Sequence, residues 1–254
     1  MQRWVYLLIA PVWALASAFL LTERGGAQAV AENHQYIRSL TMTSKSLAAD
    51  FVPDGDLGKK DWKDAVQVTI DRDAFGKAGL AEFETRVASL WTPHHLYFAY
   101  WCRYRSLNIY DGEDPAKERW ELWNRDVVEA FVNPQPERFL HYYEFEVAPN
   151  NQWIDLEIDL NKSPMNDAGW DSHFEHVTKI DAEHKVWTME MRIPVASMTA
   201  RPIHPRDEWR LNLYRCDGPG DDAHRRFMAW SPLPAGTNKS FHQPASFGVI
   251  KFVK

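Results

Sequence analysis

Six acidic residues lie in the middle of the chain, in segments where polar and apolar residues alternate. Two carboxyl groups that face each other across a cleft could hydrolyse a glycosidic bond by general acid–base chemistry. On alternating strands, however, every second side chain faces solvent, and the sequence alone brings no two of these carboxylates together. The pattern therefore favours a solvated sheet face over a catalytic pair. The six residues are Asp126, Glu129, Glu144, Glu146, Asp155 and Glu157.

Other signatures of hydrolytic chemistry are missing from the sequence. The nucleophile motif G-x-S-x-G and the zinc motif H-E-x-x-H do not occur. Neither cysteine has the setting of a catalytic thiol. We therefore expect a non-catalytic protein that acts, at most, beside enzymes of polysaccharide catabolism. A glycan hydrolase or hydrolase accessory that depends on Glu129 stays open as an alternative.

Two segments join aromatic rings to polar side chains, which is the combination that holds a sugar. One is WELWNRD at residues 120–126, and the other is KSFHQP at residues 239–244. The C–H face of a sugar ring stacks on a flat aromatic side chain, while its hydroxyl groups bond to polar groups at the ring edge. Loops beside strand ends are where a β-sandwich displays binding groups. The two segments therefore favour carbohydrate binding over catalysis.

The elements that must position these residues have the pattern of β-strands. β-Branched and aromatic residues alternate with polar ones, and Asn-Pro, Pro-Asn, Asp-Gly and Gly-Pro pairs fill the gaps. Apart from a short helical turn at 194–198, no amphipathic helix intervenes. The sequence predicts an all-β fold, an antiparallel β-sandwich of jelly-roll type. About ten strands are expected, at 82–91, 96–104, 127–133, 142–147, 153–159, 174–181, 185–193, 209–216, 227–230 and 247–253.

The N-terminal segment has the pattern of a signal peptide. Arg3 precedes a mostly apolar stretch at 5–21, and Ala27-Gln28-Ala29 offers a small-x-small cleavage site. The sequence predicts a signal peptide at 1–29, with a retained membrane anchor as the open alternative. Cleavage would make the protein secreted or periplasmic.

The rest of the chain is interpreted as one domain after a short lead. Residues 30–50 are polar and weakly patterned, which predicts a flexible N-terminal lead. Residues 51–254 form the domain, without an internal repeat or a low-complexity linker. After signal cleavage no apolar stretch long enough to cross a bilayer remains, so we expect no membrane contact.

Charge excludes one class of partner. The chain of 254 residues carries a formal net charge of −6, and no run of Lys or Arg stands out. Nucleic acids and anionic membranes need a concentrated basic face, which this sequence does not predict.

The two cysteines allow two interpretations. Cys102 and Cys216 lie near the ends of predicted strands. An even number of cysteines in an oxidising compartment allows a disulfide between them. Alternatively, each is a small buried hydrophobic residue.

An ordered series of segments resembles carbohydrate-binding module family 9 and its family 9-like relatives. It starts with FVPDGDLGKKDWKDA, where an Asp-Gly turn precedes a Trp, and it includes WNRDVVEAF and YEFEVAP. No single segment is very specific, but together they follow the family order over nearly the whole mature chain. The matching segments are 51–65, 96–100, 123–131, 143–149, 187–194, 209–215, 230–232 and 241–248.

The resemblance implies a jelly-roll sandwich that holds a sugar between two aromatic side chains. Trp123 occupies the position of one of these clamp residues. Phe241 stands where the family carries a second Trp, and its smaller ring implies a weaker or altered sugar preference.

The resemblance also implies polar contacts to the sugar. Glu129 matches an acidic residue that reaches sugar hydroxyls, and Asn212 matches an Asn on a late strand. Glu146 stands where the family has a basic residue, which changes the hydroxyl contacts. Trp120 and Asp126, from the segment around Trp123, complete the candidate site.

Cofactor binding is considered in two forms. Family members can hold structural calcium, and Asp54, Asp56 and Asp61 form a weak candidate group of oxygen ligands. An alternative function is a haem-binding electron-transfer domain of the related DOMON-like sandwich type, with Met191 or Met228 and a His as axial ligands. No C-x-x-C-H motif is present, so covalent haem attachment is excluded.

Overall fold

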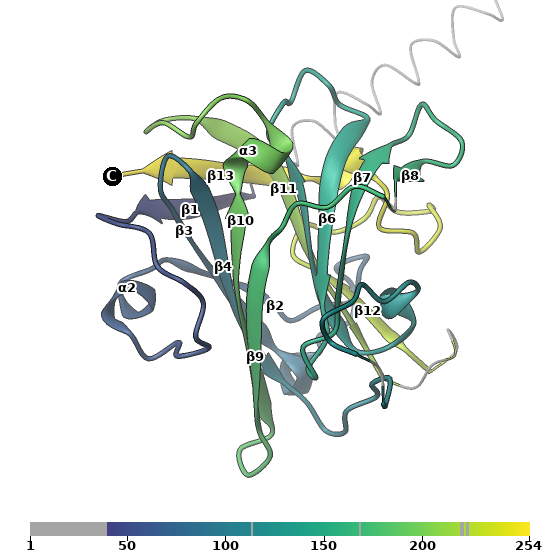
Figure 1. Cartoon of the computed structure of the whole chain (residues 1–254). Helices are drawn as coiled ribbons and strands as arrows, with labels where there is room; N and C mark the ends of the chain where they lie inside the picture. Colours follow the sequence, from purple (N-terminus) through teal and green to yellow (C-terminus); the bar gives the residue numbers. More distant parts are fainter. Residues whose placement is uncertain (1–39, 113, 168, 219–220, 222–223) are drawn as a thin grey trace, which may run out of the picture.

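The computed structural model describes residues 40–112, 114–167, 169–218, 221 and 224–254. Within them the chain forms strands joined by loops and single turns of helix (Figure 1). None of the helices in these residues is long and apolar enough to span a bilayer. The strands are β1 (Thr41–Ser46), β2 (Gln67–Ile70), β3 (Thr85–Trp91), β4 (His95–Arg103), β5 (Val127–Asn133), β6 (His141–Val147), β7 (Trp153–Asp159), β8 (Asn166–Asp167), β9 (Glu175–Asp181), β10 (Val186–Pro194), β11 (Glu208–Asp217), β12 (Arg226–Ala229) and β13 (Gly248–Val253). The helical turns are α2 (Lys60–Lys63), η1 (Ala81–Phe83), η2 (Leu122–Asn124), α3 (Val195–Met198) and η3 (Pro244–Ser246).

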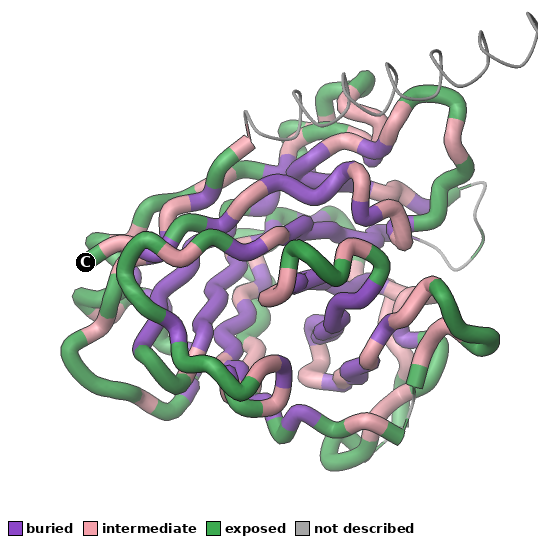
Figure 2. Tube along the Cα trace, turned by 90° about the horizontal axis from the view of Figure 1, so that it is seen from above, coloured by how far each residue is buried: buried purple, intermediate pink, exposed green. Residues whose placement is uncertain are grey.

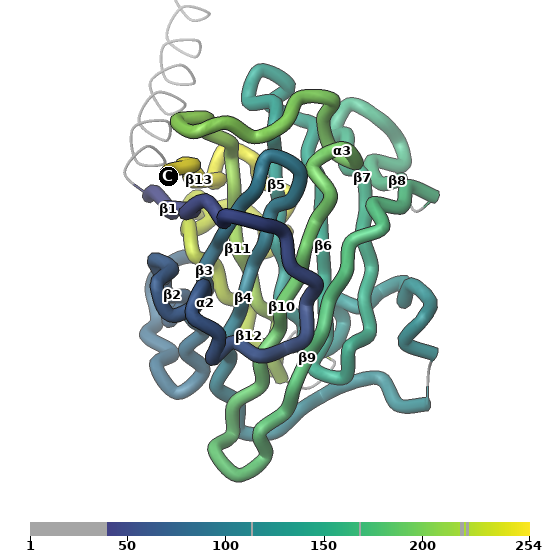
Figure 3. The backbone as a smooth tube through the Cα atoms, turned by 60° about the vertical axis from the view of Figure 1, so that its left-hand side comes forward, coloured from purple at the N-terminus to yellow at the C-terminus, as the bar shows by residue number. Residues whose placement is uncertain are grey.

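The described strands belong to one mixed sheet that curls over on itself into two layers (Figures 1 and 3). The order is β8-β7-β6-β5-β11-β13-β1-β3-β4-β10-β9, with β12 paired to β11 and β2 paired to β3. Described neighbours are antiparallel except at β1, which runs parallel to both β13 and β3. The predicted all-β sandwich is confirmed. It has 13 strands rather than about ten, and it is not purely antiparallel.

Strand β1 lies inside the segment predicted to be a flexible lead. Met42 is fully buried, and the hydroxyl groups of Ser44 and Ser89 form a hydrogen bond of 2.9 Å. The flexible-lead prediction is therefore wrong for residues 41–46. The strand is short and mostly polar, and only two of its side chains are buried, so its sequence has too little alternation to predict a strand. The signal peptide predicted at 1–29 lies outside the described residues.

The main hydrophobic core fills the space between the two layers. Alternate residues of β5 and β6 point into it, and side chains of β3, β4 and β10 meet them from the other layer. Figure 2 shows the result, with buried residues along the strands and exposed residues in the surrounding loops. Each fully buried large apolar side chain contributes about 1.5–3 kcal/mol to stability. The β5 and β6 residues are Val128, Ala130, Val132, Tyr143, Phe145 and Val147.

A second hydrophobic cluster covers the outer face of the layer that contains β5, β6, β7 and β11. Phe131, Tyr142 and Tyr214 point outward on this face. The loop before β13 packs Phe241 and Phe247 against them. The alternation of the strands thus gives this layer two apolar faces, and the outer one is where the loops converge.

The outer face of the other layer is covered by the segment that precedes β2. The indole of Trp62 donates a 2.6 Å hydrogen bond to the buried Glu190, and Lys59 lies 2.8 Å from the same carboxylate. Lys59 also pairs with Asp54 at 2.9 Å, while Asp56 accepts a hydrogen bond from the backbone N–H of Gly58. The charge of Asp54 is therefore compensated by the ammonium group of Lys59, within the same covering segment. The predicted calcium group of Asp54, Asp56 and Asp61 is not among the described side chains whose donor atoms gather closely enough for an ion.

Cys102 and Cys216 are free thiols, so of the two interpretations left open by the sequence the disulfide does not hold. Cys102 packs in the main core, whereas Cys216 packs in the outer cluster beside β5. Both cysteines are small buried residues, as the second interpretation expects. Burial raises the pKa of the Cys102 thiol to about 12, which keeps it protonated and unreactive.

The candidate haem ligands are core residues. Met191 and Met228 are both fully buried among apolar side chains between the layers. Both side chains therefore have a packing role in the core that requires no haem.

Candidate functional site

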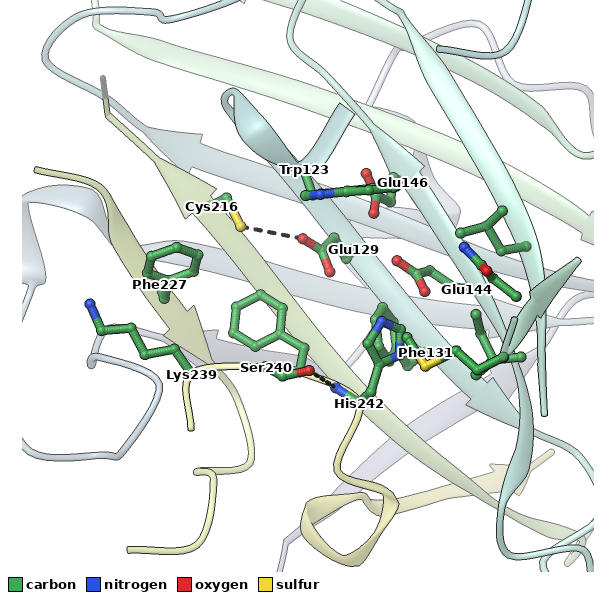
Figure 4. A pocket seen from close by; sticks show the side chains of 15 residues that line it. Trp123, Glu129, Phe131, Glu144, Glu146, Cys216, Phe227, Lys239, Ser240 and His242 are labelled. Carbon is green, nitrogen blue, oxygen red and sulfur yellow. Dashed lines mark hydrogen bonds between the residues drawn. The ribbon is translucent and has the colours of Figure 1, made fainter. Parts of the chain in front are cut away.

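A cavity of about 320 Å³ opens on the outer face of β5, β6, β7 and β11 (Figure 4). Small-ligand sites typically occupy roughly 300–1,000 Å³, so this volume is at the lower end of that range. The strands supply the floor, and residues 239–242 of the loop before β13 supply one wall. The cavity lies beside the second hydrophobic cluster, where apolar rings and polar groups meet.

Three glutamates lie on the floor of the cavity. Glu129 on β5 pairs directly with Glu146 on β6, and Glu144 lies two residues before Glu146 on the same face. One carboxylate oxygen from each lies within 4.8 Å of the other two. Figure 4 shows the three carboxyl groups side by side on neighbouring strands. We call Glu129, Glu144 and Glu146 the acidic trio.

The acidic trio is buried and only partly hydrogen-bonded. Glu146 is fully buried, and neither of its oxygens receives a hydrogen bond from outside the trio. Glu129 accepts a hydrogen bond of 3.4 Å from the thiol of Cys216. Burial, and then the charge of Glu144, raise the pKa of Glu129 to about 8. Burial, and then the charge of Glu129, raise the pKa of Glu146 well above its usual range. Unpaired buried carboxyl groups are costly, and perturbed groups of this kind are typical of functional sites.

Trp123 forms one aromatic wall of the cavity. It belongs to the η2 turn, which is anchored by the fully buried side chain of Leu122. The guanidinium of Arg225 donates a hydrogen bond to the carbonyl of Trp123, which holds the turn from the side of β12. Trp120 packs edge-on against the Trp123 ring, with centroids 5.0 Å apart. The indole is therefore held in place before any ligand arrives.

Phe241 forms another part of the cavity wall. Its ring stacks on Tyr214 with a centroid separation of 4.1 Å and an interplanar angle of 7°. The Tyr214 hydroxyl donates a 3.1 Å hydrogen bond to the Phe241 carbonyl. The next residue, His242, lies over Phe131 and shares a 2.7 Å hydrogen bond with the hydroxyl of Tyr142. The loop before β13 is thus fixed to the strands at two successive residues.

Asn212 supports the site from beneath and does not line the cavity. Its side chain is fully buried and donates hydrogen bonds to the Tyr214 hydroxyl at 2.8 Å and to the Ser231 carbonyl at 2.9 Å. Its carbonyl oxygen accepts a 3.0 Å hydrogen bond from the Ser231 backbone N–H. The predicted sugar contact is corrected to a positioning role, because these bonds consume both ends of the amide.

Two other predicted site residues also lie outside the cavity. Asp126 is fully buried and accepts hydrogen bonds from the backbone N–H groups of Gly218 at 2.8 Å and Asn108 at 2.9 Å, which ties two loops together. Trp120 is 44% exposed and reaches the site only through Trp123. The structure therefore brings together Trp123, Phe241, Glu129 and Glu146 of the predicted set.

Several cavity residues were not predicted to bind sugar. Glu144 was considered only as part of a catalytic pair, although period-two alternation places it on the same face as Glu146. Phe227 reaches the cavity from β12. The alternation of side chains along β6 is enough to predict that Glu144 lies beside Glu146. The position of Phe227 depends on the pairing of β12 with β11, which the sequence of β12 alone does not predict.

The acidic trio also determines which charged group the cavity can accept. Among the described residues it is the one set of three acidic, His or Cys side chains whose donor atoms lie close enough to surround a cation. The site offers carboxylate oxygens rather than imidazole or thiolate groups, which suits hard cations and N–H donors.

The fold and the cavity define a β-sandwich with an aromatic and acidic binding site on the outer face of one layer. The chain belongs to the carbohydrate family 9 binding domain-like family, whose model matches residues 53–254. A comparison with curated proteins found no match.

Solved structures with a similar fold include three sugar-related proteins. A candidate carbohydrate-binding protein from Bacteroides uniformis is 18% identical, with a TM-score of 0.66, covering 84% of this chain and 98% of that one. A family 9 carbohydrate-binding module from Caldicellulosiruptor kristjanssonii in complex with cellotriose is 17% identical, with a TM-score of 0.60, covering 84% and 94%. A module from the same organism in complex with glucose is 17% identical, with a TM-score of 0.59, covering 84% and 95%.

Proposed function

We propose that this protein binds a carbohydrate in the cavity lined by Trp123 and Phe241. The observation that carries the proposal is that both aromatic side chains line one cavity whose floor carries three buried carboxyl groups. An aromatic face against the C–H face of a sugar contributes on the order of 1–2 kcal/mol. The carboxyl groups can hydrogen-bond the hydroxyls and fix the orientation of the ring. Similar folds that hold cellotriose and glucose support this ligand class.

Binding without catalysis is the second part of the proposal. A glycosidase places its two carboxyl groups on either side of the bond that it breaks. The acidic trio instead projects from one sheet face, on adjacent strands. This arrangement favours contacts along one edge of a sugar. We expect no release of shorter sugars when cellotriose is incubated with the protein.

An exported location is the third part of the proposal. It is supported by the sequence pattern of residues 1–29, in which a basic residue, an apolar stretch and a small-x-small site follow one another. In that location the protein would act beside enzymes that degrade polysaccharides.

Replacing Trp123 with Ala tests the binding site. We expect Trp123→Ala to weaken binding of glucose and cellotriose by about fivefold to thirtyfold, because the stacking surface is lost. Isothermal titration calorimetry measures the affinities. Trp101→Ala is the matched control, since Trp101 is a partly buried Trp on the outer face of the other layer. If neither sugar binds the parent protein, or if Trp123→Ala binds as well as Trp101→Ala, the proposal is wrong.

A further inference from the structure

The acidic trio contains more carboxyl groups than the binding of a neutral sugar requires. Glu129 and Glu146 are direct cross-strand partners, so ionising both would place like charges where they destabilise a sheet. Glu144 adds a third carboxyl group within the same 4.8 Å. One charge-neutral hydrogen-bond acceptor could serve a hydroxyl group without this cost. The arrangement is explained if the ligand brings a positive charge.

The unpaired oxygens specify what the ligand must donate. Both oxygens of Glu146 and one oxygen of Glu144 are buried and receive no hydrogen bond from outside the trio, the one contact of Glu146 being with Glu144 itself, and both residues line the cavity. Buried acceptors of this kind need donors, and ionised ones also need a counter-charge. A hydroxyl group supplies one donor, whereas an ammonium group supplies three donors and a full positive charge.

The spacing of the acidic trio fits an ammonium group. Three acceptors that each lie about 2.8 Å from a tetrahedral nitrogen are about 4.6 Å from one another. The oxygens of the trio lie within 4.8 Å of one another. The face of Trp123 lines the same cavity and attracts a cation through its ring quadrupole.

We propose that the cavity is selective for an amino sugar, whose protonated primary amine binds the acidic trio while its ring lies against Trp123. This inference rests on the proposed carbohydrate binding and names the class of sugar. A divalent metal ion is the competing cation. It is disfavoured by its need for six to eight oxygen ligands, whereas the site offers three carboxyl groups.

Proton release should accompany binding. Burial and the neighbouring carboxyl groups raise the pKa of Glu129 to about 8, so Glu129 holds a proton at neutral pH, and they shift the pKa of Glu146 upward as well, which favours its protonated form. An ammonium group supplies the counter-charge that lets them ionise, and the released protons go to the buffer. The other described titratable and charged groups around the trio are Cys216, Arg225, Lys239, His242, Tyr100, Tyr142 and Tyr214.

Calorimetry of the full chain with glucose, glucosamine and N-acetylglucosamine tests the inference. We expect glucosamine to bind about tenfold tighter than glucose, or more, because charge-assisted hydrogen bonds replace neutral ones. N-Acetylglucosamine should lose this gain, since acetylation removes the charge. Titrations in two buffers with different ionisation enthalpies should show proton release with glucosamine alone.

Glu146→Gln adds a second readout. It should remove most of the preference for glucosamine while glucose binding changes less, and Glu183→Gln, an exposed control, should keep the preference. Equal affinities for glucose and glucosamine would overturn the inference and leave carbohydrate binding intact. A preference that disappears with a metal chelator would also overturn it, in favour of a metal ion. If none of the three sugars binds, both the inference and the proposed function are wrong.

Discussion

Glu129 and Glu146 face each other across β5 and β6 with no hydrogen bond between them, and this pair determines the chemistry of the cavity. Their placement costs stability, which the sheet tolerates by keeping the carboxyl groups protonated. Selective binding and a pH-dependent fold are therefore two consequences of one arrangement.

Stability should fall as pH rises because of Glu129. Its pKa is about 8 in the folded protein against an ordinary value of 4.5, so between these values the folded state holds a proton that the unfolded chain has lost. The stabilising contribution is complete below the unfolded pKa and disappears as pH rises through the folded pKa. We expect the free energy of unfolding to drop by about 3–4 kcal/mol between about pH 5 and pH 8. Urea unfolding of Glu129→Gln should show a flatter dependence, while Glu183→Gln should follow the parent. Parallel curves for the parent and Glu129→Gln would contradict this assignment.

At the residue scale the sequence supports a partial prediction. The resemblance to a known family singles out Trp123, Phe241, Glu129 and Glu146, and in the structure all four line one cavity. It misplaces Asn212, because the direction of an amide side chain depends on partners contributed by a loop far away in the sequence.

The loop between β12 and β13 is the element that completes the site. Ser231 at its start is bonded to Asn212, and Phe241 near its end is bonded to Tyr214 and stacked on the Tyr214 ring. The strand β11 thus supplies the anchors for both ends of the loop. A pattern search finds the strand and the aromatic residue, but it does not reveal these anchors, because they pair residues 19 and 27 positions apart.

Asn212→Ala should damage the site through this loop. The substitution leaves the Ser231 N–H and carbonyl without their buried partner, which costs about 1–3 kcal/mol of stability. Because Phe241 depends on the same anchoring, sugar affinity should fall although Asn212 touches no part of the cavity. Thermal unfolding and calorimetry measure the two effects. Asn161→Ala is the control, since Asn161 is an exposed Asn in a different loop. An unchanged affinity in a destabilised Asn212→Ala protein would separate Asn212 from the site.

At the scale of the whole molecule, β1 joins the two halves of the curled sheet. It runs parallel to β13 on one side and to β3 on the other, so the layers of the sandwich are continuous through it. The predicted fold class did not depend on this strand, which is why the sandwich could be predicted while β1 was assigned to a flexible lead. The six residues of β1 have mixed polarity and pair with strands far away in the sequence, so the local sequence does not predict a strand there.

Met42→Ala tests whether β1 is an integral part of the fold. The Met42 side chain is fully buried in the main core between the layers. Its truncation removes apolar contacts and leaves a cavity, so we expect the free energy of unfolding to fall by about 2–5 kcal/mol in urea unfolding. Thr41→Ala, at an exposed position of the same strand, should change stability far less. Because Met42 lies away from the binding cavity, the folded Met42→Ala protein should keep its sugar affinity. Equal stabilities for the two variants would mean that β1 packs only loosely and that the sheet closes without it.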